Sequence, residues 1–220
     1  NVISSSSFAA TCEAVEQNDV DLLIADTSVD WGDVYDVVHR IRHQEMGNNP
    51  FPVIIGLISD PSTENIGRAV NSGIDDILLK PITFGTLLDR ITKLISERKP
   101  FIVTSDYIGP ERRKEFRTDR TSAPSMQVPN PLNLLATGRV DHSKLQRLVN
   151  LTANQINEHK VESYAGQIVW LIDRLMPAFW YANINEETEE MLGRLVFVAE
   201  DLSRRLARTA YAHVGELSGT

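Results

Sequence analysis

The sequence predicts an α/β protein with a doubly wound parallel sheet, followed by a C-terminal α-helical hairpin. Two observations support this. In residues 1–98, short apolar runs of strand length alternate with amphipathic segments of helical spacing. Residues 141–220 carry long stretches of helical periodicity. A basic, proline-containing segment, 99–140, separates the two regions and is predicted to be a linker.

Residues 1–98 alternate between predicted strands and helices. The DLLIAD run, 21–26, lies between acids, as expected for a strand that is buried on both faces. Gly73 is suited to end a helix, and Thr83 is suited to cap the next one. The predicted strands are Val2–Ile3 (the end of a strand), 21–26, 51–59 and 75–80, and the predicted helices are Phe8–Asn18, Val34–Arg42, Thr63–Ser72 and one that follows Thr83.

Composition limits the classes of function. The chain has 220 residues, is 42% hydrophobic and carries a net charge of −8, which disfavours non-specific nucleic-acid binding. Residues 1–98 hold 7 Lys and Arg against 15 Asp and Glu, whereas residues 99–140 hold 7 against 4. Cys12 is the single cysteine, and neither a membrane-spanning run nor a signal-peptide pattern is visible. We therefore expect a cytoplasmic protein that does not insert into membranes.

Two charged side chains end neighbouring predicted strands. Asp26 ends DLLIAD, and Lys80 ends DDILLK. Because ligand sites of parallel sheets form beyond the carboxyl ends of the strands, the two charges are expected to face one crevice. Such a pair can hold a phosphoryl group, with the carboxylate as nucleophile and the ammonium neutralising the product. A purely structural Asp–Lys pair is the alternative.

The runs DLLIAD, PVIIGLIS and SGIDDILLKPI resemble the receiver domain of two-component response regulators, which has a flavodoxin-like fold. The resemblance covers residues 1–98 and is most specific in the last run. It implies that Asp26 is the phosphoacceptor, that Lys80 pairs with the phosphoryl group, and that the Lys80–Pro81 bond is cis. It also implies that Mg²⁺ is held by Asp26 and the backbone carbonyl of Ser28. The implied partner is a sensor histidine kinase or a phosphotransfer protein.

The sequence departs from the receiver pattern at its switch positions. Ile58 aligns with the family's Thr or Ser, and Ser59 is one position away, on the opposite face of the strand. Ile77 stands where the family favours an aromatic residue. The family's first strand and helix, which include two metal-binding acids, are missing, so we expect a fragment of a longer chain. A replacement strand from the run 100–106, or a strand added at the sheet's far edge, is the alternative.

The segment after the receiver-like region is rich in arginine. Arg113 and Arg117 form an RxxxR pattern like that of cyclic-dinucleotide-binding PilZ domains, but the second half of that motif is absent. We favour the interpretation that the arginines dock onto the acidic first region.

Residues 141–220 are predicted to form two long helices. Asp141 caps the first, Pro177 ends or kinks it, and Asn185 caps the second. Two antiparallel helices cannot bury both of their faces, so a dimeric four-helix bundle is expected, with Trp170, Phe179 and Trp180 near the turn. The histidines of this region lack a phosphotransfer setting, and no basic helix-turn-helix predicts DNA binding. Those histidines are His142, His159 and His213.

Two functions follow from these patterns. The first is a response regulator, not an enzyme, that accepts a phosphoryl group on Asp26 and relays the change through a helical dimerisation or partner-binding region. The second is a pseudo-receiver that acts as a scaffold for protein interactions without phosphorylation. Asp26 and Lys80 favour the first, and Ile58 and Ile77 favour the second.

Overall fold

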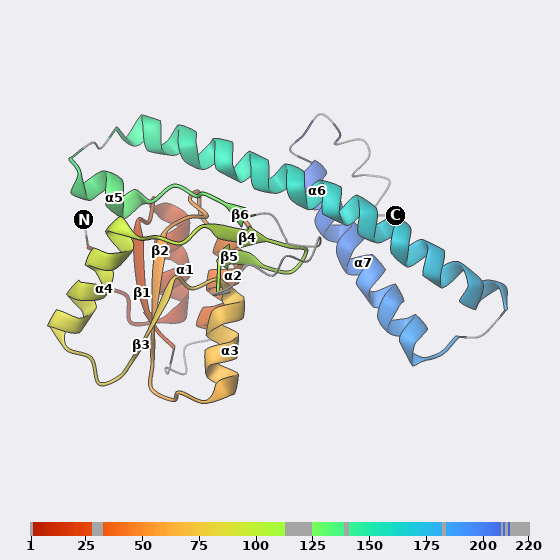
Figure 1. The fold of residues 1–220 in the computed structure, drawn as a ribbon, viewed down its shortest axis with the longest axis horizontal. Coiled ribbons are helices and arrows are strands. Elements are labelled where there is room, and N and C mark those ends of the chain that lie inside the picture. Colours follow the sequence, from red (N-terminus) through yellow and green to blue (C-terminus); the bar gives the residue numbers. More distant parts are fainter. Residues whose placement is uncertain are drawn as a thin grey trace. The chain divides into compact units, whose positions relative to one another are not determined.

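A computed structural model describes residues 2–27, 33–112, 125–138, 141–181, 184–207, 209 and 211. The chain divides into two compact units, Asn1–Ala153 and Asn154–Thr220 (Figure 1). Helix α6, His142–Trp180, contributes to both units. The division of the chain into 1–98, 99–140 and 141–220 as functional domains stays a prediction.

The first unit contains a parallel sheet of three strands in the order β1-β2-β3. In the register, Asp26 of β1 lies beside Leu57 of β2, and Leu57 lies beside Leu78 of β3. The predicted strand and helix order is confirmed from Phe8 to Ser96. The elements are α1 (Phe8–Gln17), β1 (Leu22–Asp26), α2 (Val34–Arg42), β2 (Val53–Ile58), α3 (Thr63–Ser72), β3 (Asp76–Leu79) and α4 (Phe84–Ser96).

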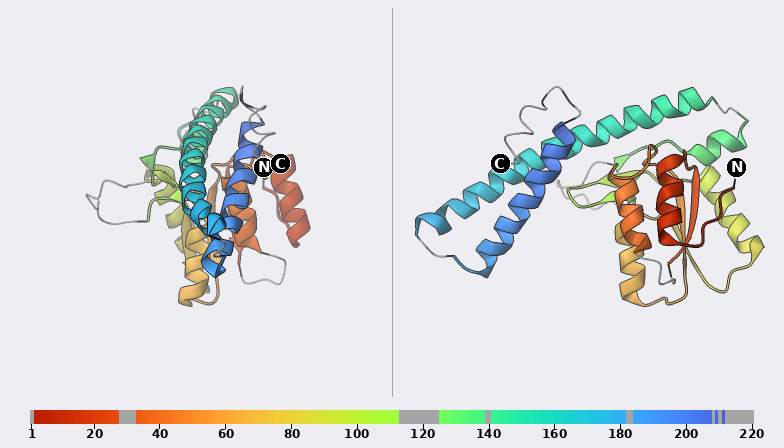
Figure 2. Two further views of the ribbon diagram at one scale, coloured as in Figure 1. Left: turned by 90° about the vertical axis from the view of Figure 1, so that its right-hand side faces the viewer. Right: turned by 180° about the vertical axis from the view of Figure 1, so that it is seen from behind.

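Helices cover both faces of this sheet, as Figure 2 shows. Successive residues of β2 point to opposite faces, so this strand contributes to two cores. Ile54 packs with Tyr35 and Val38 of α2 and with Ala69 of α3. On the other face, β2 and β3 pack against α4 and the short helix α5, Pro131–Ala136, through Val53, Ile55, Leu78, Leu94 and Leu132.

Two strand predictions are wrong. Val2–Ile3 forms no strand, and its side chains are 94% and 52% exposed. It leads through a run of serines to the α1 cap, Ser7, and makes no ladder bond. The run 100–106 neither fills nor extends the parallel sheet. Its strand β4, Phe101–Val103, instead pairs antiparallel with β5 (Ile108–Pro110) and β6 (Ser125–Met126) in a second sheet.

A buried ionic cluster closes the amino ends of β2 and β3. The Asp75 carboxylate accepts hydrogen bonds from Arg42 Nη2 at 2.8 Å, Arg98 Nε at 2.9 Å and the backbone N–H of Ile54 at 2.8 Å. All three charged side chains are at most 3% exposed. Both guanidinium groups also lie 5.0 Å from the centre of the Phe101 ring of β4. The cluster therefore joins the two sheets.

The remaining guanidinium donors of this cluster are used on backbone carbonyls. Arg42 donates to Gly73, Pro50 and Pro52, and Arg98 donates to Phe51, Pro52 and Pro129. Burial lowers the pKa of Arg42 to about 10 despite the opposing charge of Asp75, so Arg42 is still a cation at pH 7. Burial alone would raise the pKa of the Asp75 carboxyl, but Arg98 and Arg42 outweigh it and hold that pKa below its usual value.

The basic segment docks at this same end of the sheet. Arg112 donates to the backbone carbonyls of Ile74 and Asp75. Gly109 lies so close to Gly73 that a Cβ added to Gly109 would be 2.7 Å from the Gly73 Cα. Position 109 therefore requires glycine. Docking of the arginine-rich segment onto the first region is confirmed for Arg112. Arg113 and Arg117 lie outside the described residues.

The second unit is an antiparallel hairpin of α6 and α7 (Glu186–Leu206). Asn185 caps α7 in a reciprocal capping box with Thr188, as predicted for Asn185. Asp141 accepts from the N–H of Lys144 at the start of α6, which confirms that cap too. Pro177 does not end α6, which continues to Trp180. No helix in the described ranges is long and apolar enough to cross a membrane.

Polar side chains are buried at one level of this hairpin. The Tyr164 hydroxyl donates to Asp201 Oδ2 and accepts from Lys160 Nζ at 3.1 Å, while Arg205 Nε donates to Asp201 at 3.0 Å. Burial, with the neighbouring Asp201 carboxylate, raises the pKa of Tyr164. Burial opposes ionisation of Asp201, but Arg205 and Tyr164 hold its pKa below the usual value. Apolar contacts of Val198, Leu202 and Leu206 around Tyr164 complete the core.

We expect Asp75→Asn to lower the free energy of unfolding by about 3–5 kcal/mol, because it leaves two buried guanidinium groups without their counter-charge. The neighbouring Asp76→Asn is a matched control. Asp76 pairs at 3.4 Å with Arg90, whose side chain is 42% exposed, and such pairs contribute about 1 kcal/mol or less. Urea denaturation monitored by circular dichroism measures both. Equal losses in the two variants would contradict the role given to Asp75.

Comparison of the wild type with Asp75→Asn also gives a prediction for the pH dependence of stability. The pKa of Asp75 is lower in the folded state than in the unfolded state, so its stabilisation is complete above the unfolded value, about 3.9. The stabilisation is lost as the pH falls through the folded value. The stability difference between wild type and Asp75→Asn is therefore expected to be constant from about pH 7 to 5 and to shrink below about pH 4. A difference that grows on acidification would contradict this assignment.

Candidate functional site

The structure brings Asp26 and Lys80 together at the carboxyl ends of the strands. Asp26 is the last residue of β1, and Lys80 follows β3 directly, with β2 between them. The distance from Lys80 Nζ to Asp26 Oδ2 is 2.5 Å, and the two side chains are 31% and 34% exposed. The pair thus combines opposite charges with access from solvent. The pair lies at the end of the sheet opposite the buried Asp75 cluster.

Backbone geometry positions the lysine. The N–H of Lys80 donates to the carbonyl of Ile58 at 2.8 Å, which continues the β2–β3 ladder by one residue. The Lys80–Pro81 peptide bond is cis, as the resemblance implied. Thr83 then caps α4 by accepting from the N–H of Thr86. The ammonium is therefore held between a strand end and a capped helix.

The residue beside Asp26 on β2 is Leu57, not Ile58. Ile58 is 3% exposed and, by strand alternation, shares the face of Ile54, which packs against α2 and α3. Alternation takes Ser59, just beyond β2 and exposed, back to the face of Leu57. Neither Leu57 nor Ile58 carries a hydroxyl group. The strand register thus places Leu57 beside Asp26, whereas Ile58, the switch position in the resemblance, lies on the other face of the sheet.

Ile77 is partly buried against the core. It lies beside Gly56 in the register and packs against the cluster that contains Tyr35, Ile54 and Ile74. Because it precedes Lys80 by an odd number of residues, it points to the opposite face of the sheet from Lys80. Thr27, which the sequence patterns did not single out, donates its hydroxyl to the carbonyl of Leu57 at 3.1 Å and joins the ends of β1 and β2.

The described residues do not by themselves form a Mg²⁺ site. Ser28, whose carbonyl the resemblance assigns to the metal, lies outside the described residues. In the described ranges, no three His, Cys, Asp or Glu side chains are grouped closely enough to hold a metal ion. Asp26 is a single carboxylate that already faces an ammonium group. Mg²⁺ prefers six oxygen ligands, commonly one or two carboxylates with waters and phosphate oxygens.

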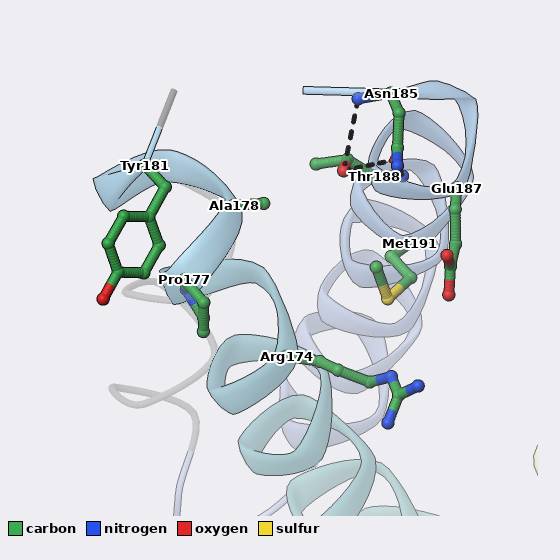
Figure 3. A pocket seen from close by; sticks show the side chains of 8 residues that line it. All are labelled: Arg174, Pro177, Ala178, Tyr181, Asn185, Glu187, Thr188 and Met191. Atoms are coloured by element: carbon green, nitrogen blue, oxygen red, sulfur yellow. Dashed lines mark hydrogen bonds between the residues drawn. The ribbon is translucent and has the colours of Figure 1, made fainter. Parts of the chain in front are cut away.

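A separate cleft of about 320 Å³ lies at the turn end of the helical hairpin (Figure 3). It is lined by the last turns of α6, including Arg174, and by the start of α7, including Met191. The polar side chains of Asn185 and Thr188 are used in the capping box. The residues that line this cleft present no nucleophile–base pair.

The three histidines considered for phosphotransfer lie elsewhere. His142 and His159 are exposed on α6, and His213 lies outside the described residues.

Comparison with known proteins adds no relative. No protein-family model matches the chain, and no curated protein matches it significantly.

We expect Lys80→Ala and Asp26→Asn each to change the free energy of unfolding by less than about 1 kcal/mol, because partly exposed ion pairs contribute little to stability. Urea denaturation provides the measurement. The result separates the two interpretations of the pair. A loss above about 2 kcal/mol would mean that the pair is a structural closure of the sheet.

Proposed function

We propose that the chain is the response regulator of a two-component phosphorelay and accepts a phosphoryl group on Asp26. The observation that supports this best is the 2.5 Å contact between Asp26 Oδ2 and Lys80 Nζ, at strand ends accessible to solvent. Parallel α/β sheets bind ligands at this end, and the resemblance to receiver domains covers both residues. The proposed donor is a phosphohistidine of a sensor kinase or phosphotransfer protein.

The reaction follows from the residues of this chain. A carboxylate oxygen of Asp26 attacks the phosphorus atom, a P–O bond forms, and the P–N bond to the donor's imidazole breaks. The imidazole takes up a proton as it leaves. The product is an acyl phosphate with more negative charge than the carboxylate it replaces. Lys80 lies where its ammonium can pair with the new phosphoryl oxygens, which stabilises the developing charge.

The charge change also alters the contacts of Lys80. In the structure described here, the ammonium bonds a carboxylate oxygen of Asp26, and on phosphorylation it moves to a phosphoryl oxygen. Because Lys80 directly precedes Pro81 and the capped start of α4, this exchange acts on the surface formed by β3 and α4. The proposal assigns the helical region the output role, through pairing of helices or binding of a partner.

A second candidate is a scaffold that binds partners without phosphorylation. Two observations favour it: Leu57, without a hydroxyl, lies beside Asp26, and Ile77 is a partly buried aliphatic residue that packs against the core. A hydroxyl and a movable aromatic residue are the parts that the receiver resemblance would require for a switch. In this interpretation Asp26 and Lys80 form a fixed ion pair.

We expect incubation of the chain with acetyl phosphate and Mg²⁺ to produce a phosphorylated species on a phosphate-affinity gel. Asp26→Asn is expected to abolish it, because the nucleophile is removed, and Lys80→Ala to reduce it. Asp89→Asn, an exposed carboxylate on α4, is the matched control and is expected to retain the shift. Absence of the species in the wild-type chain, or its persistence in Asp26→Asn, would contradict the proposal and favour the scaffold.

A further inference from the structure

Helix α6 carries a second apolar stripe that the hairpin does not bury. Val169, Ile172, Met176 and Phe179 are 60%, 42%, 41% and 50% exposed. With the exposed Ala165, their spacing is four, three, four and three residues, which is the heptad pattern of a helix–helix seam. A stripe of this spacing and exposure is unusual on a surface helix without a partner.

Helix α7 carries a matching stripe. Leu192 and Val196 are 41% and 51% exposed, and Ala199 and Ser203 continue the same spacing of four, three and four residues. Phe197, 48% exposed, borders the stripe on α7, and Trp170, 55% exposed, borders the one on α6. Both helices of the unit therefore present large apolar side chains to solvent.

The two stripes lie on one face of the hairpin. On α6, Ile172 directly follows the buried Leu171, and on α7, Ala199 directly follows the buried Val198. One residue corresponds to a rotation of about 100° around a helix axis. Because α6 and α7 run antiparallel, the same step along the chain turns both stripes to the same side. Figures 1 and 2 show that α6 and α7 diverge toward the turn that joins them.

We propose that a second copy of this chain docks on this face and completes a four-helix bundle with its two-fold axis near Ile172 and Val196. Eight large apolar side chains that are about half exposed offer roughly 600 Å² per copy, so two copies bury roughly 1,200 Å². That area is at the lower end of the range for specific, stable interfaces. A two-fold interface uses the same patch on both copies, and this patch consists of one seam on each helix, both on the same face of the hairpin.

The charges of α7 define the orientation. Its first turn carries Glu186, Glu187 and Glu189, and its last turn carries Arg204, whose side chain is 43% exposed beside Asp201, whereas Arg205 is buried inside the hairpin. Copies in antiparallel orientation place the acidic start of one α7 beside the basic end of the other. A parallel arrangement would place the acidic starts together. The interface does not depend on phosphorylation of Asp26, so it can fail or hold independently of the proposed function.

The first test is the mass of the full chain in solution, measured by sedimentation velocity at several concentrations. We expect a dimer for the wild type and a monomer for Ile172→Glu/Val196→Glu, with the concentration needed for half-association raised at least 100-fold. Ser163→Glu on the same helix and Phe84→Glu on α4, where the side chain is 78% exposed, are controls that stay dimeric. Circular dichroism checks helicity, and Val169→Glu replaces the double variant if that one unfolds.

A wild-type chain that stays monomeric would overturn the proposal and leave the face to another protein or a lipid surface. A dimer that survives in the folded double variant would also overturn it, because the interface would then lie elsewhere.

The second test concerns orientation. In a Cys12→Ser background, Ile172→Cys is expected to be joined between copies by a short bis-maleimide, because it lies near the axis. Trp180→Cys is expected not to be joined, because it lies about 12 Å farther along α6 and about 24 Å from its symmetry mate along the bundle. Efficient coupling at residue 180 with none at residue 172 would contradict the antiparallel bundle.

Discussion

The first unit depends on one buried carboxylate. Asp75 lies between two guanidinium groups, and together they bind the backbone carbonyls that precede β2 and β3. Removing charges from water is costly, so this arrangement is stable only while all three groups and their carbonyl partners are present. Through Arg98 and Phe101 the same cluster joins the parallel sheet to the second, antiparallel sheet. Residues 99–112 and 125–138, the described part of the segment after α4, therefore belong to the folded unit.

This organisation separates stability from chemistry. The amino ends of the strands are closed by charges that are almost fully buried, whereas the carboxyl ends carry an ion pair whose side chains are about one-third exposed. A partly exposed pair contributes little to folding, so its members can exchange partners at low cost. Leu57, which lies beside Asp26 on β2, adds no hydroxyl group to this pair.

Much of the fold could be predicted because its signals are local. Apolar runs, helix caps such as Asn185 and Asp141, and the meeting of Asp26 with Lys80 follow from periodicity and from parallel topology. The antiparallel sheet was not predicted, because strands of three, three and two residues show no periodicity. The Asp75 cluster was missed because its arginines resemble surface residues in the sequence. The sequence patterns could not identify the neighbour of Asp26, since only the strand register shows that Leu57 lies beside it.

The central claim is that Asp26 is chemically a phosphoryl acceptor and not a structural carboxylate. The most direct measurement is reductive trapping. After treatment with acetyl phosphate and Mg²⁺, borohydride converts an aspartyl phosphate to homoserine, and peptide mass spectrometry locates the modified residue. Homoserine is expected at position 26. Homoserine at another aspartate, or at none while acetyl phosphate is in excess, would contradict it.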